Sequence, residues 1–107
     1  MKKYKVIVTP KAQQDLKEFV DYIKNKYKNP QAAQSLLDDF VKTRKALSMT
    51  AGSIKESEIE KLKQAGLKRI NFRKHRYFLL FRMDDDAVRI TNVFCDLQDY
   101  ENKLNEW

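Results

Sequence analysis

The sequence predicts an α+β fold in which an N-terminal hairpin of two helices packs on a curved, mostly antiparallel four-stranded sheet. Two observations favour this class. Residues 10–47 carry two apolar stripes at helical spacing, and residues 67–95 change to the two-residue period of strands. The predicted order is β-α-α-β-β-β-α. A chain of 107 residues has room for one core, so residues 1–107 are expected to form one domain.

The N-terminal half begins with a strand at residues 4–9, which are β-branched and aromatic. Thr9-Pro10 and Asn29-Pro30 each combine a capping side chain with a proline at the first helical position. Since almost nothing separates the two predicted helices, they should form an antiparallel hairpin. Each helix has one apolar stripe that we assign to the core: Ala12, Leu16, Phe19, Val20, Ile23 and Tyr27 in the first, and Ala33, Leu36, Leu37, Phe40, Val41 and Leu47, interrupted by Arg44, in the second.

The C-terminal half is predicted to supply the rest of the sheet. Residues 48–66 are a connection in which Ile59 and Leu62 could support a short helix. Three strands then follow as a meander, with short turns between them. The middle strand is apolar on both faces, which predicts a central position. The strands are expected at residues 67–73, 76–83 and 87–95, and Asp96 with Asp99 can cap a final helix that carries Tyr100 and Leu104.

Several function classes are excluded by what the sequence lacks. The only glycines are Gly52 and Gly66, so no glycine-rich loop can cradle a nucleotide phosphate. Cys95 is the only cysteine and His75 the only histidine, which leaves too few ligands for a cysteine-based zinc site. We therefore expect no metal and no small-molecule cofactor. The single cysteine and the lack of a long apolar run favour a cytoplasmic protein that does not engage a membrane.

A basic block is the main candidate for binding. The chain has a net charge of +7, and residues 67–83 hold six of its cations and no acid. Such a field attracts polyanions or an acidic protein, although charges on a strand can also serve to block edge-to-edge aggregation. Interleaved aromatic residues could stack on unpaired bases. The candidate nucleic-acid-binding residues are Lys68, Arg69, Arg73, Lys74, Arg76 and Arg82.

Two further side chains could carry chemistry. His75 lies in the predicted turn 73–76, where a histidine is most simply exposed, and proton transfer is its functional alternative. Cys95 ends an apolar strand and is interpreted as a small buried hydrophobic residue rather than a nucleophile.

The order of these features resembles the RelE/ParE-type toxins of bacterial toxin–antitoxin modules. The resemblance spans nearly the whole chain and rests on several short motifs in the expected order. They are YKVIVTPKAQQDL at 4–16, YI at 22–23, NPQAA at 29–33, GLKRI at 66–70, RYFLLFR at 76–82, the acidic turn at 84–86 and VRITNVF at 88–94.

The resemblance implies one of two activities, because this family contains ribosome-dependent mRNA endoribonucleases (RelE-like) and inhibitors of DNA gyrase (ParE-like) on one scaffold. Arg69 and Arg73 match basic residues of the cleaving members. Phe78 and Leu97 stand where those members place arginines. Cys95 stands where many ParE-like members have a histidine before a Gln-Asp pair, which is present here as residues 98–99.

For RNA cleavage, the resemblance and the residue chemistry together suggest one set of candidates. Arg69, Arg73 and Arg76 could stabilise the charge of the phosphorane, and the proton carrier could be His75, Asp99 or Tyr100.

The resemblance also implies a cognate antitoxin as partner, with the ribosome and its mRNA or DNA gyrase as target. We expect a small antitoxin that is acidic over its toxin-binding part and wraps the helical hairpin and a sheet edge. We favour mRNA cleavage, because the basic block is dense and has no acid. Gyrase inhibition without a catalytic site of its own is the alternative, and a non-toxic module that binds RNA or an acidic protein is a further one.

Overall fold

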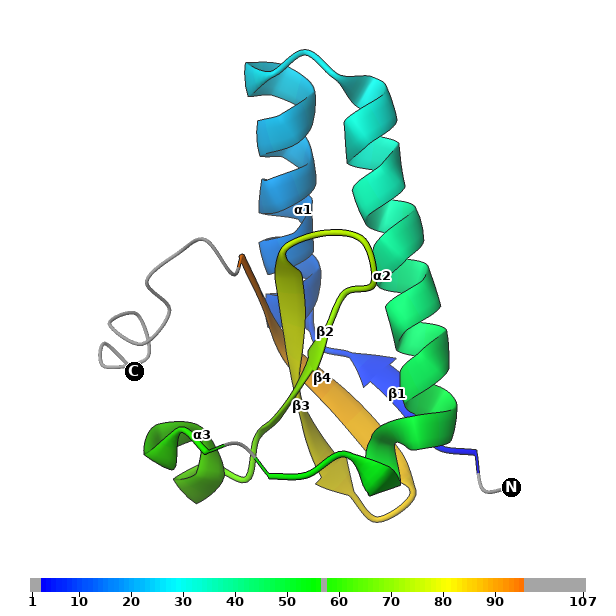
Figure 1. The fold of residues 1–107 in the computed structure, drawn as a ribbon, viewed down its shortest axis with the longest axis vertical. Coiled ribbons are helices and arrows are strands. Elements are labelled where there is room, and N and C mark those ends of the chain that lie inside the picture. The colour runs from blue at the N-terminus through cyan, green and yellow to red at the C-terminus, as the bar shows by residue number, and fades with distance from the viewer. Residues whose placement is uncertain (1–2, 57, 96–107) are drawn as a thin grey trace.

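A computed structural model of the chain describes residues 3–56 and 58–95, and Figure 1 shows its fold. The predicted final helix, with Asp99, Tyr100 and Leu104, lies outside these residues. Before it, the elements follow the predicted order. They are β1 (Lys5–Val8), α1 (Pro10–Lys26), α2 (Pro30–Thr50), the 3-10 turn η1 (Ala51–Ser53), α3 (Glu60–Gln64), β2 (Lys68–Asn71), β3 (Tyr77–Asp84) and β4 (Ala87–Cys95).

The four strands form one sheet in the order β1-β4-β3-β2. β1 runs parallel to β4, and the β2–β3 and β3–β4 pairs are antiparallel. The helical hairpin of α1 and α2 stands against this sheet in Figure 1. The prediction of an α+β fold with a helical hairpin on a mostly antiparallel sheet is therefore confirmed.

Both helix starts are capped as the sequence predicts. The Thr9 hydroxyl accepts a hydrogen bond from the amide of Ala12 at 3.3 Å, and the Asn29 side chain accepts one from Ala32 at 3.1 Å. Between the helices, Lys28 adopts a left-handed backbone with φ of 50°. This residue reverses the chain after α1, so that a very short connection suffices for the hairpin.

The sheet is buried on both faces at β3. Leu79 and Phe81 contact the core beneath the hairpin, whereas Phe78 and Leu80 face a second, smaller cluster. Alternate residues of a strand point to opposite faces, so an apolar strand needs cover on both sides. The hairpin covers one face. The other face is covered by the segment between α2 and β2, because Leu62 of α3 is fully buried in the second cluster.

β4 extends beyond the end of its neighbour β1, and α1 supplies a hydrogen-bond acceptor to the part of β4 that β1 does not reach. β1 ends where Val8 pairs with Ile90, because the chain then turns into α1. Farther along β4, the Val93 amide donates to the carboxylate of Asp15 on α1, at 3.1 Å. Lys11 also contacts this buried carboxylate. A helix side chain thus accepts the hydrogen bond that a neighbouring strand would otherwise accept.

Replacing Asp15 should therefore be costly. Asp15→Ala leaves the buried Val93 amide without its acceptor, and we expect the free energy of unfolding to fall by about 2 kcal/mol. Asp21→Ala is the matched control on the same helix, because within the described residues the Asp21 carboxylate pairs only with exposed Lys17, at 2.9 Å. That change should cost at most about 0.5 kcal/mol. Urea unfolding followed by circular dichroism measures both, and equal losses would contradict this role of Asp15.

Candidate nucleic-acid interface and partner groove

The loop between β2 and β3 is fastened to α2 by one carboxylate. Asp39 accepts backbone hydrogen bonds from Arg73 at 3.1 Å and from Lys74 and His75 at 2.9 Å each. The ring nitrogen Nδ1 of His75 lies 2.7 Å from the same carboxylate. Asp39 is only 3% exposed, so these bonds form in a site from which water is largely excluded. The basic loop is therefore held in one conformation against the hairpin.

The surroundings of Asp39 favour its charged form. Burial alone would raise the pKa of this carboxyl, but hydrogen bonds from the His75 ring and from the amides of Lys74, Arg73 and His75 outweigh it. The pKa of Asp39 is therefore held below its ordinary value.

The expectation that His75 is simply exposed is wrong. Its side chain is 24% exposed, because the ring turns inward to Asp39. With Nδ1 facing the carboxylate, Nε2 is the ring nitrogen left to exchange a proton with a ligand. A carboxylate that orients an imidazole in this way is an arrangement suited to general acid–base chemistry.

Three of the predicted cations share this loop. Arg73, Lys74 and Arg76 are exposed around His75, so the structure brings four candidate residues together within one turn. A pocket of about 460 Å³ lies between Arg73, Lys74 and the Asp39 region of α2. A phosphate near His75 would therefore meet positive charge from its neighbours in the sequence.

The other predicted cations lie elsewhere on the sheet. Arg69 places its guanidinium 3.9 Å from the ring centre of Phe78, and its Nε donates to Asn71 at 2.8 Å. By strand alternation, Arg82 lies on that same face of the sheet, whereas Lys68 lies on the face of the hairpin. The six cations of the block therefore do not form one patch.

Phe78, which the resemblance marks as an altered position, is part of the core. Its side chain is fully buried in the second cluster, and it also carries the guanidinium of Arg69 on its ring. Cys95 is partly exposed, so the prediction of a buried cysteine is wrong; it lies at the end of β4, beside Tyr77. Leu97, Asp99 and Tyr100 lie outside the described residues.

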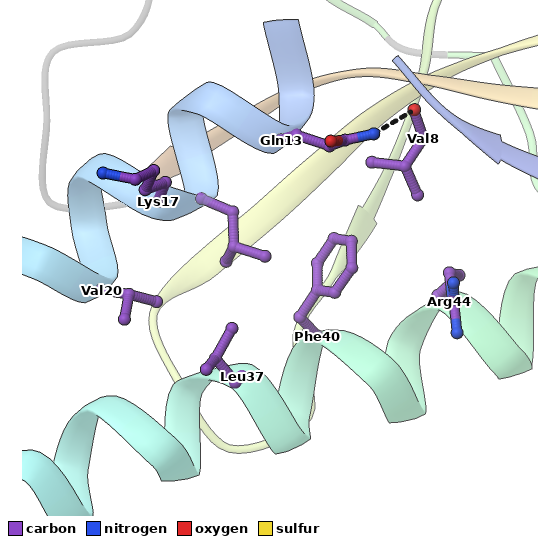
Figure 2. A pocket seen from close by; sticks show the side chains of 8 residues that line it. Val8, Gln13, Lys17, Val20, Leu37, Phe40 and Arg44 are labelled. Carbon is purple, nitrogen blue, oxygen red and sulfur yellow. Dashed lines mark hydrogen bonds between the residues drawn. The ribbon is translucent and has the colours of Figure 1, made fainter. Parts of the chain in front are cut away.

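A second candidate site is a groove between α1 and α2, of about 490 Å³. Figure 2 shows side chains from both helices turned toward it, with the Gln13 side chain donating to the Val8 carbonyl at 3.1 Å. Most of the lining is apolar, and Lys17 on α1 and Arg44 on α2 add a positive charge from each helix. The apolar lining residues are Val8, Leu16, Val20, Leu37 and Phe40.

Sequence reasoning missed this groove, because it assigned both apolar stripes to the core. Leu16 and Phe40 are buried, but Val20 and Leu37 remain partly exposed. The one signal was Arg44, a cation within the second apolar stripe. A charged residue at a core position indicates that the stripe is wider than the core and reaches a surface.

The described residues offer neither a metal site nor a membrane-spanning helix. Within residues 3–56 and 58–95, no group of three or more histidine, cysteine or acidic side chains could hold a metal ion. In the same part of the chain, no helix is both long and apolar enough to cross a membrane.

Comparisons with known proteins decide the family. A family model described as the ParE toxin of the type II toxin-antitoxin system parDE matches residues 6–100. The chain belongs to this ParE toxin family. It is therefore a toxin of a type II toxin-antitoxin system, and a non-toxic binding module is no longer a competing explanation. No curated protein sequence shows significant similarity to it.

Two solved structures share the fold of this ParE-family toxin. The chromosomal ParDE toxin-antitoxin system of P. aeruginosa matches with a TM-score of 0.69 and 20% identity, covering 89% of this chain and 98% of that one. The toxin-antitoxin complex RelBE2 of Mycobacterium tuberculosis matches with a TM-score of 0.55 and 24% identity, covering 87% and 98%. The RelE/ParE resemblance seen in the sequence is thus confirmed.

Removal of the charge on Asp39 should destabilise the toxin in a pH-dependent way. Asp39→Asn replaces one acceptor of buried amides with a donor, and we expect a loss of about 2 kcal/mol at pH 7. Because the folded pKa of Asp39 is lowered, its stabilising effect is complete above the unfolded value of about 3.9 and disappears as pH falls through the folded value.

The difference between the wild type and Asp39→Asn should therefore shrink as the pH falls below about 4. Thermal unfolding at a series of pH values measures it. Asp38→Asn is the control, since the neighbouring carboxylate is exposed and bonds only to Gln34 among the described residues, at 3.0 Å. A loss that stays constant down to pH 2 would contradict the ionic role of Asp39.

Proposed function

We propose that an acidic antitoxin segment holds this toxin inactive by occupying the groove between α1 and α2. The groove combines an apolar floor with a cation on each helix, Lys17 and Arg44. An amphipathic segment with carboxylates along its edges would match both features. Both structures compared above are described as toxin-antitoxin assemblies, which supports a protein partner of this kind.

Reversing the charges of the groove should weaken the complex. Lys17→Glu together with Arg44→Glu places two carboxylates opposite the acidic segment, and we expect the Kd to rise by at least tenfold, mainly through slower association. Lys45→Glu is the control, because Lys45 is exposed on α2 and does not line the groove. Titration calorimetry with the antitoxin encoded beside the toxin gene measures the change. Equal effects of the two variants would contradict the groove as the docking site.

For the target of the free toxin, we propose mRNA cleavage centred on the loop of Arg73, His75 and Arg76. The observation that supports it is the Asp39–His75 pair, with Nδ1 of the ring 2.7 Å from the carboxylate, between two exposed arginines. His75 Nε2 would take the proton from a ribose 2′-hydroxyl, and the 2′-oxygen would attack the adjacent phosphorus.

The rest of the reaction needs charge stabilisation and an acid. Arg73 and Arg76 would stabilise the negative phosphorane. The bond from phosphorus to the 5′-oxygen would then break, which leaves a 2′,3′-cyclic phosphate, and the leaving oxygen would take up a proton. Asp99 and Tyr100 remain the candidates for that acid.

Gyrase inhibition is the second candidate. Its support is the match to the ParE family model and the burial of Phe78, which leaves no cation at a position where cleaving relatives are expected to have one. On this alternative, the loop of Arg73 and Arg76 would bind a protein or DNA surface and perform no chemistry.

The two candidates separate in paired assays. Primer extension on a reporter mRNA after toxin induction should show cuts in phase with codons, and gyrase supercoiling activity should be unchanged. Arg73→Ala and Arg76→Ala should each weaken cleavage about a hundredfold. Arg89→Ala, which removes an exposed arginine paired with Asp84 at 2.8 Å on another part of the sheet, should not. Intact mRNA together with stalled gyrase–DNA complexes would show that the second candidate is correct.

The role of His75 has its own test. His75→Asn keeps a side-chain donor near Asp39 but cannot exchange a proton, so cleavage should fall at least about a hundredfold. The melting temperature should change little. Full cleavage by His75→Asn would contradict the acid–base role and leave the arginines as the sole contribution of this loop.

A further inference from the structure

A third cavity lies between α1, the start of β3 and the end of β4. It has a volume of about 430 Å³ and is lined by Glu18, Phe19, Tyr22, Tyr77 and Cys95. The rings of Phe19 and Tyr77 meet edge to face, with centroids 4.9 Å apart. Burial, and then the neighbouring Cys95, raises the pKa of Tyr77 to about 12, so its hydroxyl stays protonated at neutral pH. The cavity is therefore mainly aromatic, with donors and acceptors at its edge.

The rim of this cavity carries exposed aromatic rings. Tyr22 and Tyr27 are 49% and 64% exposed, and their rings meet edge to face with centroids 5.7 Å apart. The Lys26 ammonium lies 5.3 Å from the centre of the Tyr22 ring. Hydrogen bonds from Tyr27 and Lys26 lower the pKa of Tyr22. Two neighbouring rings and a cation therefore lie together at the end of α1.

The tip of the hairpin is positively charged and projects beyond the sheet (Figure 1). Residues 22–30 contain Lys24, Lys26 and Lys28 and no acid. Lys24 and Lys28 form no ion pair with any residue in the described ranges. Among the described residues that line the cavity, Glu18 is the one acid, and its Oε1 already accepts from Gln14 at 3.0 Å. The tip therefore offers free cations next to stacking surfaces.

We propose that this cavity and the hairpin tip bind single-stranded nucleic acid. One unstacked base enters the cavity beside Tyr22, the next base stacks on Tyr27, and the phosphates between them contact Lys24 and Lys28. Aromatic rings flanked by cations are the combination that proteins use to hold unpaired strands without reading their sequence. An acidic protein would meet the same cations but would not need the aromatic cavity.

The position of Tyr77 links this site to the basic loop. Tyr77 begins β3 and directly follows Arg76, so the cavity and the loop are consecutive along the chain. A single-stranded nucleic acid bound at the cavity could therefore extend to His75. Binding itself does not depend on cleavage, since no residue of the cavity is assigned to the proposed reaction.

Direct binding of a fluorescein-labelled eight-nucleotide strand to the full chain tests the stacking contacts by fluorescence anisotropy. Tyr22→Ala and Tyr27→Ala should each raise the Kd about tenfold. Tyr22→Phe and Tyr27→Phe keep the ring and should stay within about twofold of the wild type. Met49→Ala, which removes another exposed apolar side chain on α2, is the control and should have no effect. Wild-type affinity in both alanine variants would overturn the proposal.

Cys95 provides a readout specific to the cavity, because it is the only cysteine and lines the wall. The bound nucleic-acid probe should slow the reaction of the Cys95 thiol with a disulfide reagent at least about fivefold, as expected when a base occupies the cavity. An abasic strand of equal length supplies the phosphates without the bases and should leave the rate unchanged. Equal protection by both strands, or none by either, would overturn base binding here. Cleavage is tested separately by primer extension. Binding at the cavity can therefore be demonstrated even if the toxin does not cleave mRNA.

Discussion

The carboxylate of Asp39 is the interaction on which the functional surface depends. A loop of consecutive basic residues repels itself and would otherwise sample many conformations, since its charges gain nothing by lying close together. Asp39 supplies one buried negative charge that three consecutive amides and an imidazole can share. Because the carboxylate projects from α2, the position of the loop is set by the packing of the hairpin on the sheet. The geometry of the candidate site is thus a consequence of the core.

The hairpin contributes a buried carboxylate to the sheet in a second place. Asp15 on α1 accepts a hydrogen bond from the amide of Val93, just as Asp39 on α2 accepts hydrogen bonds from amides of the β2–β3 loop. In both cases a strand or loop has backbone donors without a neighbouring strand, and a helix side chain accepts from them. The hairpin therefore fixes the sheet by hydrogen bonds as well as by apolar contact, and its outer surfaces remain available for partners.

The elements of the fold could be predicted because each is encoded locally. Thr9-Pro10, Asn29-Pro30 and the alternation after Leu67 are read within a few residues, and the structure has elements at each of these places. The site could be predicted only in part. The cations of residues 73–76 were identified by charge, but Asp39 is 34 residues from Arg73, and one aspartate in an exposed-looking helix gives no sign of its partner. The inward turn of His75 depends on that contact and was missed with it.

The pairing of β1 has a consequence for how the toxin is made. Within the described part of the chain, β1 forms ladder hydrogen bonds only with β4, and Lys5 pairs with Ala87. During synthesis the hairpin can form early from local contacts, whereas the first strand has no partner until the last described strand has left the ribosome. The sheet therefore closes only after β4 has been synthesised. A chain that stops before β4 would carry an unpaired β1 and an uncovered apolar hairpin face, and would be a substrate for proteases rather than a folded toxin.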